Sequence, residues 1–102
     1  MMRMKRIYIQ KDKIIVGRDV SCELYIDKSN TYVSRMHAVF FYEDEQWYIM
    51  DNYSCNGTWV NGNFKLTPGE KYRLEIDDEI DFAHTKRYRF FGYAKLINRS
   101  IR

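Results

Sequence analysis

The feature that most constrains the fold is a succession of short runs of β-branched, aromatic and aliphatic residues separated by polar turns. Several runs alternate between apolar and polar residues, which is the pattern of a strand with one buried face. Nowhere does an apolar pattern at helical period persist over three turns, so we expect no helix. The runs occupy residues 6–10, 14–16, 23–26, 37–42, 46–50, 72–74, 79–82 and 87–91, and residues 59–64 hold two further short runs on either side of a turn.

The segments between the runs contain residues that favour chain reversal. Asn61-Gly62 between apolar residues predicts a hairpin, because both central residues of a type I′ turn need positive φ. In Pro68-Gly69 the proline pre-sets φ and the glycine tolerates a sharp reversal. About ten short strands joined in this way predict an all-β fold, a β-sandwich of two antiparallel sheets.

The composition agrees with this fold and narrows the function. There are nine Tyr, six Phe and two Trp, whereas Ala stands only at positions 38, 83 and 94, a balance that favours sheet over helix. The formal net charge is +3 and acidic residues interleave with basic ones, whereas binders of bulk nucleic acid show a basic stripe. We therefore expect no specific nucleic acid as partner, although a weak basic patch of Arg87, Arg89, Arg99 and Arg102 keeps that alternative open.

The sequence also bears on compartment and domain organisation. No apolar run approaches the roughly 18 residues of a membrane span and no signal peptide follows Met1, so no membrane insertion is expected. The two cysteines, Cys22 and Cys55, do not make a disulfide framework, which predicts a reduced, cytoplasmic protein. We expect one domain over 1–96, with 97–102 as a tail or the start of a linker in a larger multidomain protein.

Three polar loops, 17–21, 30–35 and 54–57, carry more special chemistry than the others. Alone, each is ordinary, since Arg18 could be a solvated arginine and Ser34 a turn residue. Together they supply what a bound phosphate ester needs: a guanidinium, a hydroxyl, backbone N–H groups and a glycine that lets the backbone approach. An asparagine amide, with a donor and an acceptor, suits a peptide main chain running past it.

These loops resemble those of a known family, the forkhead-associated (FHA) domain. The motifs are a Gly-Arg pair, a Ser-x-x-His motif, an Asn-Gly segment and a closing Leu-to-Phe segment, in that order. In this sequence they are Gly17-Arg18, Ser34-Arg35-Met36-His37, Asn56-Gly57-Thr58-Trp59-Val60-Asn61-Gly62 and Leu74–Phe82, and the likeness covers roughly residues 5–93. It implies a sandwich of about eleven strands whose loops at one end bind phosphothreonine in an extended peptide.

The resemblance further implies a phosphopeptide-binding module for signalling or regulated assembly, with a partner protein phosphorylated by a Ser/Thr kinase. It implies no enzyme activity, no catalytic residue, no metal and no cofactor. The site residues that it implies are Arg18, Ser34, Arg35 and Cys55 for the phosphate, Asn56 for the peptide backbone, and Gly17, His37 and Gly57 for structural support.

Two positions depart from the family pattern. Where the family commonly offers a Thr or Ser hydroxyl to the phosphate, this chain has Cys55, whose thiol is a weak donor. We expect help from the backbone N–H at this position and weaker or altered binding. Asp77 stands where the closing segment has a glycine, and Asp tolerates left-handed geometry better than most residues.

Two further functions compete with phosphopeptide binding. Cys55 with His37 or His84 could form a nucleophile–base pair, although other convincing catalytic partners are lacking. The same fold could instead bind a partner without phosphorylation or self-associate, through exposed aromatic residues such as Tyr32 or Tyr53.

Overall fold

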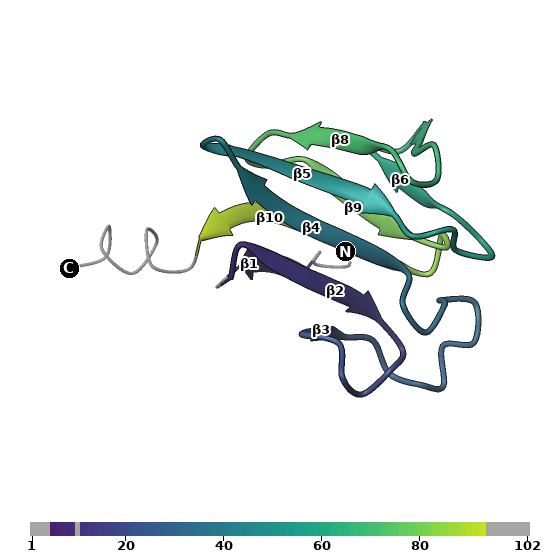
Figure 1. Cartoon of the computed structure of the whole chain (residues 1–102). Helices are drawn as coiled ribbons and strands as arrows, with labels where there is room; N and C mark the ends of the chain where they lie inside the picture. The colour runs from purple at the N-terminus through teal and green to yellow at the C-terminus, as the bar shows by residue number, and fades with distance from the viewer. Residues whose placement is uncertain (1–4, 10, 94–102) are drawn as a thin grey trace.

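A computed structural model describes residues 5–9 and 11–93, and within these ranges it contains ten strands and no helix. Figure 1 shows the strands in two layers. The predicted tail at 97–102 lies outside the described residues. The strands are β1 (Lys5–Ile9), β2 (Lys13–Gly17), β3 (Leu24–Tyr25), β4 (Ala38–Glu43), β5 (Gln46–Asp51), β6 (Thr58–Val60), β7 (Phe64–Lys65), β8 (Lys71–Leu74), β9 (Glu79–Phe82) and β10 (Lys86–Tyr93).

The predicted all-β sandwich is confirmed, with a refinement in strand direction. One sheet has the order β1-β10-β9-β6-β7 and the other β3-β2-β4-β5-β8. Six of the pairings are antiparallel, but β1 runs parallel to β10 and β2 runs parallel to β3, so both sheets are mixed. An alternating pattern could not reveal this, because it fixes which side chains share a face and says nothing of the neighbouring strand's direction.

The core between the sheets is built from the inward-facing positions of these alternating strands. In β10, the buried Tyr88 and Phe90 alternate with the more exposed Arg87 and Arg89. The Phe90 ring stacks on Phe40 of the opposite sheet with their centroids 5.9 Å apart. Burying one such aromatic side chain contributes about 1.5–3 kcal/mol, so contacts of this kind hold the two layers together.

The β4–β5 and β6–β7 turns differ in length and geometry from what the sequence predicts. In the β4–β5 hairpin Glu43 pairs with Gln46, so Asp44 and Glu45 alone make the turn, with φ of 49° and 61°. Asn61 and Gly62 also have positive φ, 53° and 87°, but Val60 pairs with Phe64 and the loop is therefore one residue longer. The tight two-residue turn with positive φ thus belongs to Asp44–Glu45, where the sequence predicted a polar turn but not this geometry.

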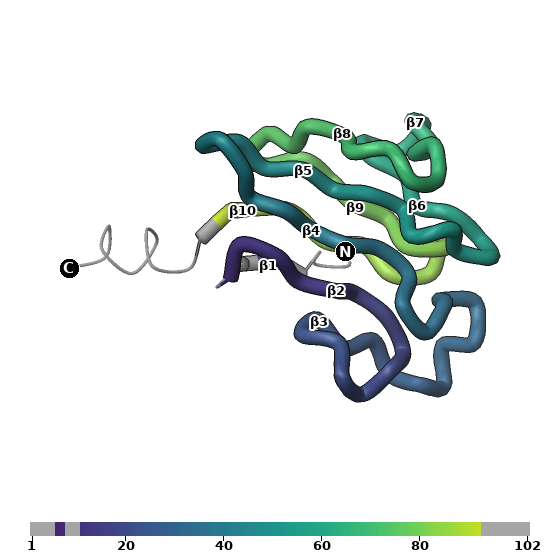
Figure 2. Tube along the Cα trace, in the orientation of Figure 1, coloured from purple at the N-terminus to yellow at the C-terminus, as the bar shows by residue number. Residues whose placement is uncertain are grey.

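The three loops singled out in the sequence lie at one end of the sandwich, where β2 and β5 end and β4 begins (Figures 1 and 2). Hydrogen bonds join neighbouring loops there. For example, the backbone N–H groups of Arg18 and Asp19 donate to the carbonyl oxygens of Ser34 (3.2 Å) and Arg35 (3.0 Å). Since the described residues form strands and loops only, they include no helix that could cross a membrane.

The β4–β5 turn offers a direct stability test. Glu45→Gly is expected to raise the free energy of unfolding by about 0.5–1 kcal/mol, because glycine removes the left-handed penalty of a residue with a Cβ. Urea unfolding measures the change. The matched control is Gly62→Ala, whose added Cβ meets nothing within 4 Å, so that only its φ of 87° is strained. This variant should lose about 1 kcal/mol, and stabilisation by it would contradict the interpretation.

Candidate functional site

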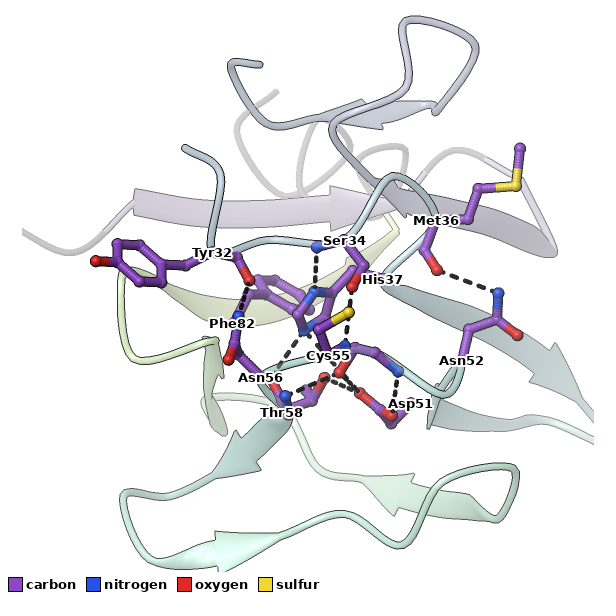
Figure 3. A network of polar contacts seen from close by, with 12 residues as sticks. Tyr32, Ser34, Met36, His37, Asp51, Asn52, Cys55, Asn56, Thr58 and Phe82 are labelled. Carbon is purple, nitrogen blue, oxygen red and sulfur yellow. Dashed lines mark hydrogen bonds and ion pairs between the residues drawn. The ribbon is translucent and has the colours of Figure 1, made fainter. Parts of the chain in front are cut away.

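The imidazole of His37 connects the loop before β4 to the loop after β5. His37 is fully buried, with 0% exposure. The Ser34 N–H donates to Nδ1 at 2.9 Å, so Nδ1 carries no proton, and Nε2 then donates to the Gly57 carbonyl oxygen at 2.8 Å. Burial lowers the pKa of His37, against the opposing effects of the Gly57 carbonyl and the Asp51 carboxylate. The ring is therefore a neutral spacer between the two loops (Figure 3).

Beneath His37, the carboxylate of Asp51 organises the β5–β6 loop. Asp51 is 1% exposed, and its Oδ1 lies 4.0 Å from His37 Nε2. Oδ1 accepts hydrogen bonds from the hydroxyls of Ser54 (2.6 Å) and Thr58 (2.7 Å), and Oδ2 accepts one from the Ser54 N–H (3.0 Å). Ser54 Oγ in turn accepts from the Gly57 N–H at 2.9 Å. A buried charge needs such partners, and here they fix the path of the loop.

Ser34, Cys55 and Asn56 are brought together above this layer. The Cys55 N–H donates to Ser34 Oγ at 3.0 Å, which places the thiol-bearing residue directly beside the serine hydroxyl. The Asn56 side-chain amide donates to the Tyr32 carbonyl oxygen at 2.8 Å, while the Tyr32 ring points away from the network (Figure 3). Cys55 and Asn56 are both exposed. The two loops thus present a hydroxyl, a thiol and a carboxamide on one surface.

Arg18 is held against the same surface by its backbone and its side chain. A Cβ on the preceding Gly17 would clash with the Arg35 carbonyl oxygen, so glycine is needed for the loops to approach. Arg18 Nε donates to the Val33 carbonyl oxygen. Within residues 5–9 and 11–93, no carboxylate lies at ion-pairing distance from Arg18. Its guanidinium is therefore anchored by a hydrogen bond and has no carboxylate partner among the described residues.

Arg35 has a different environment from Arg18. Its Nη2 lies 3.1 Å from Asp19 Oδ2, and its side chain is 75% exposed. Hydrogen bonds from the Ser21 hydroxyl and N–H, together with Arg35, lower the pKa of Asp19 to about 2. Asp19 is consequently ionised at neutral pH, and Arg35 reaches a ligand only by exchanging one anion for another.

The catalytic pairs considered for Cys55 are not assembled. Both ring nitrogens of His37 are occupied by Ser34 and Gly57. His84 Nδ1 lies 3.0 Å from Asp81 Oδ2, and the ring stacks on Trp59 with centroids 3.6 Å apart. Among the described residues there is no group of three His, Cys, Asp or Glu side chains that could hold a metal ion.

The basic patch considered for nucleic acid is largely neutralised where the structure describes it. Arg87 Nε lies 3.4 Å from Asp81 Oδ2, and Arg89 Nη1 lies 3.5 Å from Asp77 Oδ1. Arg99 and Arg102 fall outside the described residues. Asp77 has a φ of 81°, the left-handed geometry that was expected of a residue replacing glycine.

Sequence reasoning did not find the supporting layer of Asp51, Ser54 and Thr58. The spacing Asp51-Asn52-Tyr53-Ser54 is compatible with a side chain that caps its own turn, and this was the available signal. What the spacing could not show is that Asp51 is buried beside His37, since that depends on the packing of β4 against β5.

Comparison with known proteins agrees with this architecture. Residues 14–83 match the FHA domain family, and the chain belongs to that family. FHA domains are binding modules rather than catalytic domains. The probable E3 ubiquitin-protein ligase dma1 of Schizosaccharomyces pombe is 44% identical over 55 residues, which are 54% of this chain and 19% of that protein. The chain thus spans less than a fifth of that curated relative's length.

Solved FHA domains with bound peptide are similar in structure. The MEK1 FHA domain in complex with a HOP1 phosphothreonine peptide has a TM-score of 0.63 and 29% identity, over 78% of this chain and 79% of that chain. The N-terminal FHA domain of Saccharomyces cerevisiae Rad53p in complex with a phosphothreonine peptide has a TM-score of 0.59 and 28% identity, over 71% of this chain and 59% of that chain.

The buried, neutral His37 predicts a pH-dependent stability. In the unfolded chain a histidine takes up a proton as the pH falls below about 6.5, whereas the lowered pKa of His37 keeps it neutral in the fold. The unfolded state then binds more protons, so the free energy of unfolding decreases as the pH falls, by up to about 1.4 kcal/mol at pH 5.5. Urea midpoints between about pH 7.5 and 5.5 measure this.

Two variants assign the pH effect. His37→Gln should be destabilised and have a flatter profile than the wild type, and His84→Gln, which alters the contact with Asp81, measures what the other histidine contributes. If His37→Gln does not fold, the pH profiles of the wild type and His84→Gln still test whether His37 causes the pH dependence. A flat wild-type profile, or a slope that disappears in His84→Gln, would contradict the assignment.

Proposed function

We propose that this chain binds phosphothreonine in an extended segment of a partner protein. The proposal rests on one observation, that Arg18 and the exposed Ser34–Cys55 contact lie on neighbouring loops. The Arg18 side chain is anchored by a hydrogen bond and has no carboxylate partner in the described part of the chain. FHA domains of similar structure have phosphothreonine peptides bound. The site needs no cofactor for this function.

The phosphate contacts follow from the chemistry of the loops. A phosphothreonine carries nearly two negative charges at neutral pH, and a guanidinium forms charge-assisted, bidentate hydrogen bonds with it. We assign this role to Arg18, whose Nε is already engaged and whose terminal nitrogens remain for the ligand. The Ser34 hydroxyl accepts from Cys55 and so has its own hydrogen to donate.

We assign the second negative charge of the phosphate to Arg35. Its ion pair with Asp19 is exposed, and exposed pairs contribute only about 0–1 kcal/mol. Breaking the ion pair of Arg35 with Asp19 therefore costs little free energy, and a contact with a doubly charged phosphate can replace it. Asn56 is assigned to the peptide backbone. Its amide nitrogen already binds Tyr32, which leaves the carboxamide oxygen to accept an N–H from the ligand.

Arg18→Ala is expected to lower the affinity for a phosphothreonine peptide at least tenfold, about 1.4 kcal/mol. Arg18→Lys should recover only part of the loss, because lysine keeps the charge but not the planar fork. Calorimetry measures the affinity, with Arg73→Ala as control, since Arg73 is an exposed arginine of β8. Unchanged binding by Arg18→Ala, with an unchanged unfolding midpoint, would remove Arg18 from the site.

Cys55→Thr tests the departure from the family pattern. We expect affinity to rise by a few fold, up to about 1 kcal/mol, because a hydroxyl replaces a weak thiol donor next to the phosphate. Cys55→Val has nearly the shape of threonine without the hydroxyl and serves as the matched control. Equal effects of the two substitutions would show that shape, and not hydrogen bonding, governs this position.

A phosphorylation-independent partner, or self-association, is the alternative function. It is favoured by the thiol at Cys55 and by the exposure of Tyr32 (63%) and Tyr53 (73%) at the same end of the fold. One peptide compared with and without its phosphate separates the two functions. We further propose that the domain is a module of a larger cytoplasmic protein and that a Ser/Thr kinase prepares its ligand.

A further inference from the structure

A pocket adjoins the Ser34–Cys55 contact and is not used by the phosphate contacts assigned above. It holds about 290 Å³ and is lined by Asp51, Ser54, Cys55, Gly57, Lys65, Leu66, Thr67 and Pro68. One wall is therefore the β5–β6 loop, and the other is β7 with the segment that follows it. Cys55 belongs both to this pocket and to the hydrogen bond with Ser34, so the pocket lies directly beside the proposed phosphate site.

Lys65 is the cation of the pocket. Its ammonium lies 5.5 Å from the centroid of the Trp59 ring, and a Cβ on Gly57 would be 2.9 Å from its Cε, so the side chain packs across the loop. In the part of the chain that the structure describes, no carboxylate lies within ion-pairing distance of Lys65. A positioned cation therefore remains available to a ligand.

The acidic residue of the pocket does not cancel this charge. Asp51 is 1% exposed, and its two oxygens accept the hydrogen bonds of Ser54 and Thr58. Its charge is thus satisfied inside the domain. Leu66 is buried, whereas Lys65 and Pro68 are exposed, so an ion pair with Lys65 would form at the surface and be screened by salt.

We propose that this pocket takes the carboxylate side chain of an Asp or Glu that lies close to the phosphothreonine in the ligand. The inference rests on the proposed function. Residues of an extended peptide are spaced about 3.3 Å apart, so the acidic residue lies within about three positions of the phosphothreonine. Arg18 and Arg35 satisfy the phosphate, and Lys65 gives the second anion a cation of its own.

The test is a set of phosphothreonine peptides with alanine on both sides, in which one Glu or one Gln is moved through the flanking positions. At one position the wild-type domain should bind the Glu peptide about three- to fivefold more tightly than the Gln peptide, as measured by fluorescence anisotropy at low salt. Lys65→Met keeps the packed stem and should abolish this preference, and Lys65→Glu should invert it. Lys28→Met, at an exposed lysine of the β3–β4 loop, should leave the preference in place.

The outcomes separate this inference from the proposed function. Equal binding of phosphorylated and unphosphorylated peptides by the wild type would overturn the proposed function. Phosphate-dependent binding without any Glu preference, or with a preference that persists in Lys65→Met, would overturn the acidic subsite alone. A matching leucine scan that gives a stronger preference than Glu would show that the pocket takes an apolar side chain instead.

Discussion

The binding end of this domain depends on one buried imidazole with a fixed tautomer. His37 accepts from the loop before β4 through Nδ1 and donates to the loop after β5 through Nε2. A protonated ring would have a donor at both nitrogens and would face the Ser34 N–H with one of them. Burial keeps the ring neutral, so the same desolvation that forms the core also selects the protonation state that the loops require.

Around His37 the polar groups form an inner layer that supports an outer, ligand-facing layer. Asp51 and the hydroxyls of Ser54 and Thr58 satisfy one another below the surface, while Arg18 and Ser34 lie above. The carboxylate and hydroxyl groups of the inner layer are hydrogen-bonded to one another. In the proposed binding of a phosphopeptide, the contribution of this layer is to hold the outer groups in place before the ligand arrives, which reduces the ordering cost of association.

What the sequence predicted and what it did not can be traced to particular residues. Alternation located the strands, because a buried residue such as Tyr88 between Arg87 and Arg89 has one possible face in a sandwich. The two parallel pairings and the left-handed geometry of the Asp44–Glu45 turn were not predicted, since apolar periodicity encodes neither strand direction nor the sign of φ. The Asp19–Arg35 ion pair was also unpredicted, because it joins two loops whose approach depends on the space left at Gly17.

The direction of β10 determines which end of the domain is free for attachment after this strand. β10 begins at the turn whose Thr85 Oγ1 accepts a hydrogen bond from Asn30, next to the binding loops, and it runs away from them to Tyr93. In Figure 1 its arrow ends on the side opposite those loops. A reporter or surface anchor joined directly after Tyr93 would therefore leave the proposed peptide-binding end unobstructed, which would suit the domain to immobilisation as an affinity reagent.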